Sequence, residues 1–214
     1  MIDIVPRRGP SDDILLSADR NPNTNGARLI LGSTSEPGAK LIAIAEAVKS
    51  GQIKALVMLK ENAMHLGISV EQLAQLPVFI AMNVLSHEAT ERATVVLPAC
   101  GFAEKRGSMV NGKGRLQRLN RAVRPPGNAR EDWEILRDLL LAIGGGDSLL
   151  SIEDIFRRIS ETIPVFAGLS LSKIGDLGVH ILQMEELPPM HPSDEENIEQ
   201  AVAIQARRRA VRSH

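Results

Sequence analysis

The chain has 214 residues, and its 43% hydrophobic and 24% charged content is typical of one globular domain, with or without an appendage, and excludes a disordered or fibrous protein. The net charge of −1 and the 2% of aromatic residues argue against a nucleic-acid partner, because they provide neither attraction to phosphate nor stacking surfaces. No run approaches the roughly 18 apolar residues of a membrane span, and the N-terminus lacks the apolar core of a signal peptide. We therefore expect a cytoplasmic protein with no direct membrane insertion.

Composition divides the chain into three expected segments. Residues 1–28 are rich in Pro, Gly, Asn and Asp and are predicted to be an irregular lead-in. Residues 29–146 are predicted to form an α/β domain, and residues 147–214 a helical and irregular extension. The extension ends in a predicted helix, which the capping box at 193–196 begins. The apolar stripe of this helix is thin, so we expect the tail from about residue 189 to become ordered only against a partner.

The domain at 29–146 alternates helical and strand-like patterns. Apolar residues recur at helical spacing over 39–50, and further helical segments are expected over 69–73 and 86–92. Short apolar runs that are typical of buried strands occupy 53–59, 78–82 and 94–98. This alternation predicts βαβ units and a Rossmann-like layered α/β fold, with a mainly parallel sheet and helices on its faces.

A basic segment follows at 105–124, with seven Lys and Arg residues and no acidic residue. Its glycines predict a loop with a short hairpin. Residues 107–113 match the phosphate-loop pattern G-x-x-x-x-G-K, but Gly114 stands where a Ser or Thr hydroxyl would bind Mg²⁺. We therefore favour ion pairs between these cations and carboxylates elsewhere in the protein. An independent anion- or nucleotide-binding module at 105–124 stays open as an alternative.

Two helices are predicted beyond this segment. Asn128 and Glu131 resemble an N-cap and its reciprocal partner, and the apolar pattern behind them predicts a helix to about Ile143. A second amphipathic helix is predicted over 152–162, and irregular chain over 163–192.

No motif in the chain defines a catalytic centre. The five histidines have no metal-ligand spacing, and the single cysteine, Cys100, can form neither an internal disulfide nor an iron–sulfur cluster by itself. Cys100 follows a predicted strand, where a small buried apolar residue is the ordinary role of cysteine. We therefore predict no catalytic residue and no metal site.

Two stretches, Thr94–Arg118 and Pro125–Leu136, carry a long and specific pattern. The residues that carry it are Val95–Pro98, Phe102, Glu104, Lys105, Gly107, Asn111, Gly114, Arg115, Gln117, Pro125–Gly127, Ala129, Arg130 and Asp132–Leu136. This pattern resembles the molybdopterin oxidoreductase family. Weaker similarities upstream, at 23–27 and 49–56, extend the resemblance over residues 12–146.

Catalytic members of that family bind a molybdenum bis-pterin guanine dinucleotide, and this chain departs from their pattern at three places. Residues 60–63 read Lys-Glu-Asn-Ala where relatives have Gly-Glu-Asn-Pro, so Asn62 is kept while glycine and proline are lost. Ala81-Met82 replaces Gln-Asp at the end of the next strand, and Thr94 replaces an acidic residue. A lysine at 60 would crowd a pyrophosphate that must lie against the backbone. The resemblance therefore implies that the fold is kept and that no cofactor is bound.

Within the family, the pattern is most similar to the C-terminal part of the large iron–sulfur subunit of NADH–quinone oxidoreductase. That similarity implies a non-catalytic scaffold domain, with the other subunits of a respiratory NADH dehydrogenase as partners, at the cytoplasmic side of the inner membrane. In such a domain we expect Glu104, Asn111 and Arg115 to be architectural. The alternative is a fragment of an active, formate-dehydrogenase-like oxidoreductase that contributes to the molybdopterin guanine dinucleotide site. The cofactor-binding residues would then be Asn62, Glu104, Asn111 and Arg115.

Overall fold

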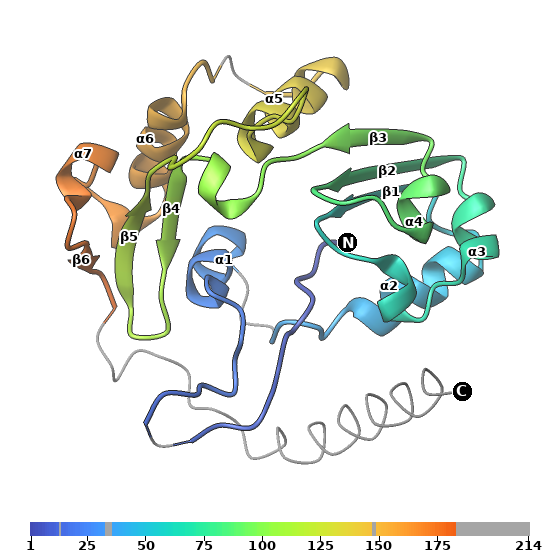
Figure 1. Ribbon diagram of the computed structural model, residues 1–214, viewed down its shortest axis with the longest axis horizontal. Coiled ribbons are helices and arrows are strands. Elements are labelled where there is room, and N and C mark those ends of the chain that lie inside the picture. Colours follow the sequence, from blue (N-terminus) through green and yellow to red (C-terminus); the bar gives the residue numbers. More distant parts are fainter. Residues whose placement is uncertain (13, 33–35, 147–148, 183–214) are drawn as a thin grey trace.

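The computed structural model describes residues 1–12, 14–32, 36–146 and 149–182, so the predicted terminal helix and the expected partner-dependent tail lie outside the described residues. The predicted α/β class is confirmed: a three-stranded parallel sheet and a smaller antiparallel sheet are both present. Figure 1 shows the two sheets on opposite sides of the molecule, with helix α5 (Asp132–Ala142) at the top. In the described ranges, no helix is both long enough and apolar enough to cross a membrane.

The parallel sheet forms from the three predicted apolar runs. Its strands are β1 (Ala55–Leu59), β2 (Val78–Asn83) and β3 (Val95–Pro98), in that spatial order. Helix α2 (Leu41–Lys49) leads into β1, and the connections between strands contain η1 (Ala63–Leu66), α3 (Val70–Ala74) and α4 (Glu88–Glu91). Helix α3 begins at a capping box between Ser69 and Gln72, which explains why the short helix starts there.

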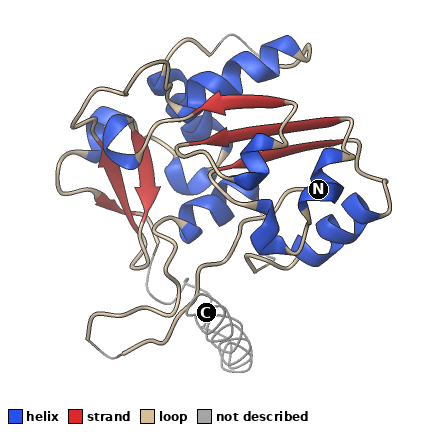
Figure 2. Ribbon diagram, turned by 45° about the vertical axis from the view of Figure 1, so that its right-hand side comes forward, coloured by secondary structure: helices blue, strands red, loops and turns tan. Residues whose placement is uncertain are grey.

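Helices α2, α3 and α4 cover one face of this sheet, and α5 covers only the carboxyl end of the other, so the expected helices on its faces are present but unevenly distributed. One apolar cluster joins Met58, Phe79 and Ala81 of the sheet to Ala45, Val48, Leu73 and Ala89 of the helices. The strand order explains the difference, because successive right-handed crossovers along β1-β2-β3 place each helix on the same side. Figure 2 shows the three strands as one layer, set apart from the antiparallel sheet.

The opposite face of the parallel sheet is apolar and mostly open. Val57, Ile80 and Val95 lie side by side on it, and Val57 and Val95 are each 42% exposed. The carboxyl end of this face is covered, because Ile135 of α5 packs against Met82. Parallel sheets are ordinarily buried on both faces, so an open apolar face is unusual for this kind of sheet.

The basic segment contains the predicted hairpin. Strands β4 (Gly107–Val110) and β5 (Arg115–Leu119) pair antiparallel, and β5 also pairs with β6 (Val179–His180). Gly114 has a φ of +73°, and a Cβ there would lie 2.7 Å from the carbonyl oxygen of Leu182, so the turn requires glycine. The phosphate-loop match therefore lies in a strand and a turn that lead to another strand, not to a helix N-terminus.

The hairpin shares a core with the following helices. These are α6 (Ile152–Thr162), which spans the predicted range, η3 (Pro164–Phe166) and α7 (Leu171–Ile174). The shared apolar cluster includes Val110 and Leu116 of the hairpin and Phe156, Phe166, Leu171 and Ile174 of the helices. This core crosses the domain boundary expected at 146. The prediction of irregular chain over 163–192 is wrong in its described part, because elements of two to four residues are too short to show periodicity.

Two helix starts also differ from expectation. Helix α1 (Thr24–Leu31) begins inside the expected lead-in, where the Asn23 side chain accepts a 2.8 Å hydrogen bond from the Val110 backbone and ties the helix start to β4. Helix α5 has Glu131, not Asn128, at its N-cap. Arg130 pairs through its backbone with Pro98 and Cys100, which holds the chain extended there and delays the helix.

Candidate functional site

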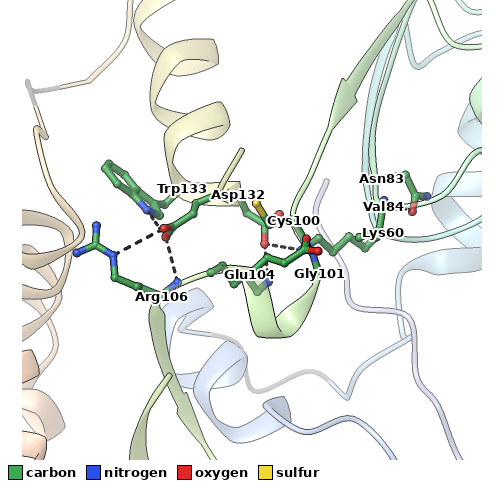
Figure 3. A network of polar contacts seen from close by, with 11 residues as sticks. Lys60, Asn83, Val84, Cys100, Gly101, Glu104, Arg106, Asp132 and Trp133 are labelled. Atoms are coloured by element: carbon green, nitrogen blue, oxygen red, sulfur yellow. Dashed lines mark hydrogen bonds and ion pairs between the residues drawn. The ribbon is translucent and has the colours of Figure 1, made fainter. Parts of the chain in front are cut away.

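The carboxyl ends of the parallel strands meet at one edge of the sheet, the place where open α/β sheets bind ligands. Lys60 follows β1, Asn83 ends β2, and Cys100 lies just after β3. Figure 3 shows these residues in a polar network that continues to Asp132, with Arg106 and Trp133 at its far side. The partners of each polar group decide what this edge can bind.

Lys60 has the most unusual backbone in this network. Among the described residues it is the one non-glycine residue with a positive φ, at +54°, a region that favours glycine. Its backbone N–H donates to the Met82 carbonyl at 2.7 Å. Its ammonium donates to the Cys100 carbonyl at 2.6 Å and to Asp132 Oδ2 at 2.7 Å. The Lys60 side chain thus links the end of β1 to the segment after β3 and to the start of α5.

Asp132 joins two lysines at this edge. The Lys105 ammonium lies 2.6 Å from the same oxygen, Asp132 Oδ2, that accepts from Lys60. Burial lowers the pKa of Lys60, and the neighbouring Lys105 charge lowers it further, while Asp132 offsets part of this effect. The Lys60–Asp132–Lys105 cluster is a compact internal ion pair network in which one carboxylate holds together three segments of the chain.

The asparagine side chains at the strand ends also form hydrogen bonds within the protein. Asn62 caps η1, because its Oδ1 accepts from the Met64 backbone at 3.1 Å. Asn83 donates to the Glu61 carbonyl at 3.1 Å and lies 2.8 Å from His87 Nε2. These side chains therefore satisfy the backbone and one another.

Glu131 is the one buried carboxylate among the residues that the structure describes, with a side chain only 1% exposed. It accepts from the Arg106 backbone at 3.1 Å, from the Trp133 indole at 2.9 Å and from the Arg121 guanidinium. Burial would raise the pKa of Glu131, but the hydrogen bonds from Arg106, Arg121 and Trp133 outweigh burial and lower it. Glu131 thus fixes the hairpin base against α5.

The structure does not gather the four predicted cofactor-binding residues into one site. Asn62 lies at the end of β1, and Glu104, in η2 (Phe102–Glu104), accepts from the Gly101 backbone at 2.8 Å. Asn111 Oδ1 accepts from the backbone of Lys113 and of Arg115 at 3.0 Å each, in the hairpin turn. The Arg115 guanidinium donates to the Leu177 carbonyl at 3.0 Å. These contacts support the architectural expectation for Glu104, Asn111 and Arg115.

The sequence marks Lys60 as a departure from a family pattern but gives no sign of its partners. Asp132 lies within a matched motif and Glu131 just before it, yet no local signal links either residue to Lys60 or Arg121. For the basic segment, the predicted ion pairs are confirmed at Lys105, Arg106, Arg118 and Arg121, which face Asp132, Glu131 and Asp176. Burial raises the pKa of Cys100, and nearby carboxylates add to the effect, so its thiol stays protonated.

Comparisons with known proteins show which family this chain belongs to. The family model described as molybdopterin oxidoreductase matches residues 21–141, more than half of the chain. The chain belongs to the molybdopterin oxidoreductase family. It is 35% identical over 130 residues to the alpha subunit of F420-dependent formate dehydrogenase 2 from Methanococcus maripaludis, covering 58% of this chain and 19% of that protein. It is 32% identical over 155 residues to the assimilatory nitrate reductase catalytic subunit of Bacillus subtilis, covering 67% and 22%.

A solved structure supports the fold. Acetylene hydratase from Pelobacter acetylenicus superposes with a TM-score of 0.51 at 16% identity, covering 69% of this chain and 20% of that chain. The chain thus spans about a fifth of the length of the relatives it matches. These relatives are formate dehydrogenase and nitrate reductase subunits, so they do not indicate NADH–quinone oxidoreductase in particular.

The residues at the strand ends fit a guanine dinucleotide poorly. The Lys60 side chain lies across the ends of the strands, and the side-chain oxygens of Asn62 and Asn83 accept from local backbone groups. Asp132 Oδ2 holds the ammonium groups of both Lys60 and Lys105, so neither cation is free to pair with a pyrophosphate. The polar groups that a nucleotide would need are used inside the protein.

Proposed function

We propose that this chain is a structural segment of a larger molybdopterin-dependent oxidoreductase of the formate dehydrogenase and nitrate reductase type, and that it holds no dinucleotide itself. The observation that carries the proposal is the Lys60–Asp132–Lys105 cluster, which closes the strand ends where a ligand would enter. The open apolar face with Val57 and Val95 supports a role inside a larger protein, since it is a face that parallel sheets ordinarily bury.

A second candidate function is a contribution to the guanine dinucleotide site of an active enzyme. It is favoured by the similarity to named catalytic subunits, at 31–35% identity to the F420-dependent formate dehydrogenase alpha subunits. In that case Asn62, at the position that the family pattern keeps, would contact the nucleotide. Membership of an NADH–quinone oxidoreductase stays a prediction that rests on the sequence pattern.

Replacing Lys60 by methionine separates these functions. If Lys60 is structural, Lys60→Met lowers the free energy of unfolding by about 1–3 kcal/mol, because Asp132 and the Cys100 carbonyl lose their donor. Chemical denaturation measures this change, and calorimetric titration with guanosine diphosphate shows no binding to the wild-type chain. Lys49→Met is the control, because the partner of Lys49 within the described ranges is exposed Glu46 on α2. Binding of guanosine diphosphate that Lys60→Met weakens at unchanged stability would contradict the structural role.

A further inference from the structure

A cavity of about 550 Å³ lies away from the strand ends, between the hairpin and the second group of helices. Its walls come from the base of β4 and β5, from the first turns of α6 and from the chain that enters α7. This volume is within the roughly 300–1,000 Å³ typical of small-molecule sites. Arg106, at the base of the hairpin, is the one described residue that this cavity shares with the polar network at the strand ends.

Three arginines line the cavity: Arg106, Arg118 and Arg157. Glu153 is the one acidic residue among the described lining residues, so the lining carries an excess of positive charge. The hydroxyls of Ser170 and Ser172, 3.0 Å apart, add polar groups to the wall. Guanidiniums and hydroxyls are the groups that bind phosphate oxygens in proteins.

Two of these arginines have hydrogen-bond donors to spare. Arg118 Nε is buried and has no hydrogen-bond partner among the described residues. The Arg106 guanidinium lies 3.7 Å from Glu131 and 3.6 Å from Glu153, distances that are too long for hydrogen bonds. A buried donor without an acceptor is unfavourable, so an anion that reached Arg118 would gain a hydrogen bond that the protein itself leaves unmade.

Two carboxylates outside the cavity lining form ion pairs with the lining arginines and would compete with a bound anion. Asp176, 90% exposed, lies 3.3 Å from the terminal nitrogen of Arg118, and Asp154 lies 2.6 Å from that of Arg157. Each contact engages one terminal nitrogen of its arginine and orients the guanidinium. The Arg118–Asp176 pair is exposed at its carboxylate, so it contributes little energy and yields readily to a ligand of higher charge.

We propose that this cavity binds the phosphate group of a small phosphorylated molecule. Arg106 and Arg118 from the hairpin and Arg157 from α6 would surround the phosphate, and the apolar side chains of Ile152, Leu169 and Leu171 would contact the rest of the ligand. This site is independent of the proposed function, since it shares no residue with the Lys60–Asp132–Lys105 cluster.

Calorimetric titration of the full chain with inorganic phosphate and with pyrophosphate tests the proposal. We expect saturable binding of at least one probe, weakened about tenfold or more by Arg118→Gln, because a charge-assisted hydrogen bond is lost. Arg124→Gln, in the same basic segment but outside the cavity lining, should bind as the wild type does. If Arg118→Gln fails to fold by circular dichroism, the more exposed Arg157→Gln takes its place.

Three results would overturn this assignment. The first is the absence of binding of both probes at millimolar concentration. The second is equal affinity in the wild type and in the folded cavity variant, which would place the anion elsewhere. The third is an equal loss of affinity in Arg124→Gln, which would show attraction to the basic segment as a whole and not to the cavity.

Discussion

Replacing Glu131 by alanine should lower the free energy of unfolding by about 3–5 kcal/mol. The Trp133 indole and the Arg106 backbone N–H would lose their acceptor, and the Arg121 guanidinium would lose its charge partner, all at the junction of the hairpin and α5. Denaturant unfolding followed by Trp133 fluorescence measures the change. Glu134→Ala is the matched control, since Glu134 forms a 3.6 Å ion pair with half-exposed Arg130 and its loss should cost less than about 1 kcal/mol.

The Glu131 carboxylate should make the free energy of unfolding fall as the pH is lowered. The pKa of Glu131 is lowered in the folded protein, so its contribution is fully present above the ordinary glutamate pKa of about 4.3 and is lost as pH falls through the lower folded value. Glu131→Gln removes the titrating group, so its stability should change less than that of the wild type on acidification. Identical acid profiles for the two proteins would show that Glu131 does not anchor this junction.

Replacing Phe156 by alanine should also cost about 3–5 kcal/mol, because it leaves a cavity in the second core. Phe156 is 3% exposed and packs edge to face on Phe166, with ring centroids 6.2 Å apart. Since Val110 and Leu116 belong to the same cluster, hydrogen exchange should accelerate in β4 and β5 as well as in α6.

Leu177→Ala is the control for that experiment, because Leu177 is 87% exposed and should change stability by less than about 0.5 kcal/mol. Faster exchange confined to α6, with the hairpin unaffected, would mean that the hairpin and the extension do not share one cooperative core. That result would favour the domain boundary expected at 146.

Local patterns predicted the elements of the fold well and their arrangement poorly. The apolar runs at 53–59, 78–82 and 94–98 became β1, β2 and β3 because short buried strands carry a strong local signal. No local pattern indicates the spatial order of these strands. The open face with Val57 and Val95 depends on that order, so it was not predicted. Strand β6 has two residues and exists only through its pairing with β5, so no local pattern could indicate it.

The candidate site was predictable only in part, for a similar reason. A lysine at position 60 is conspicuous because a family pattern has glycine there, and its φ of +54° agrees with a backbone that favours glycine. Its partner Asp132 lies 72 residues along the chain. The pairing depends on how α5 packs against the sheet, and no single segment of the sequence predicts that packing. Glu131 was expected to be the reciprocal partner of a cap at Asn128. It is itself the N-cap residue of α5, and its side chain joins that helix to Arg121 and the hairpin base.

The most direct test of the structural role is the cofactor content of the full-length chain, purified from a host that makes molybdopterin guanine dinucleotide. Elemental analysis for molybdenum and tungsten, with pterin fluorescence after oxidation, gives the content of metal and pterin per chain. We expect neither above background, because Lys60, Asp132 and Lys105 occupy the strand ends. Molybdenum or tungsten with pterin in stoichiometric amounts would contradict this and would establish the chain as part of a dinucleotide site.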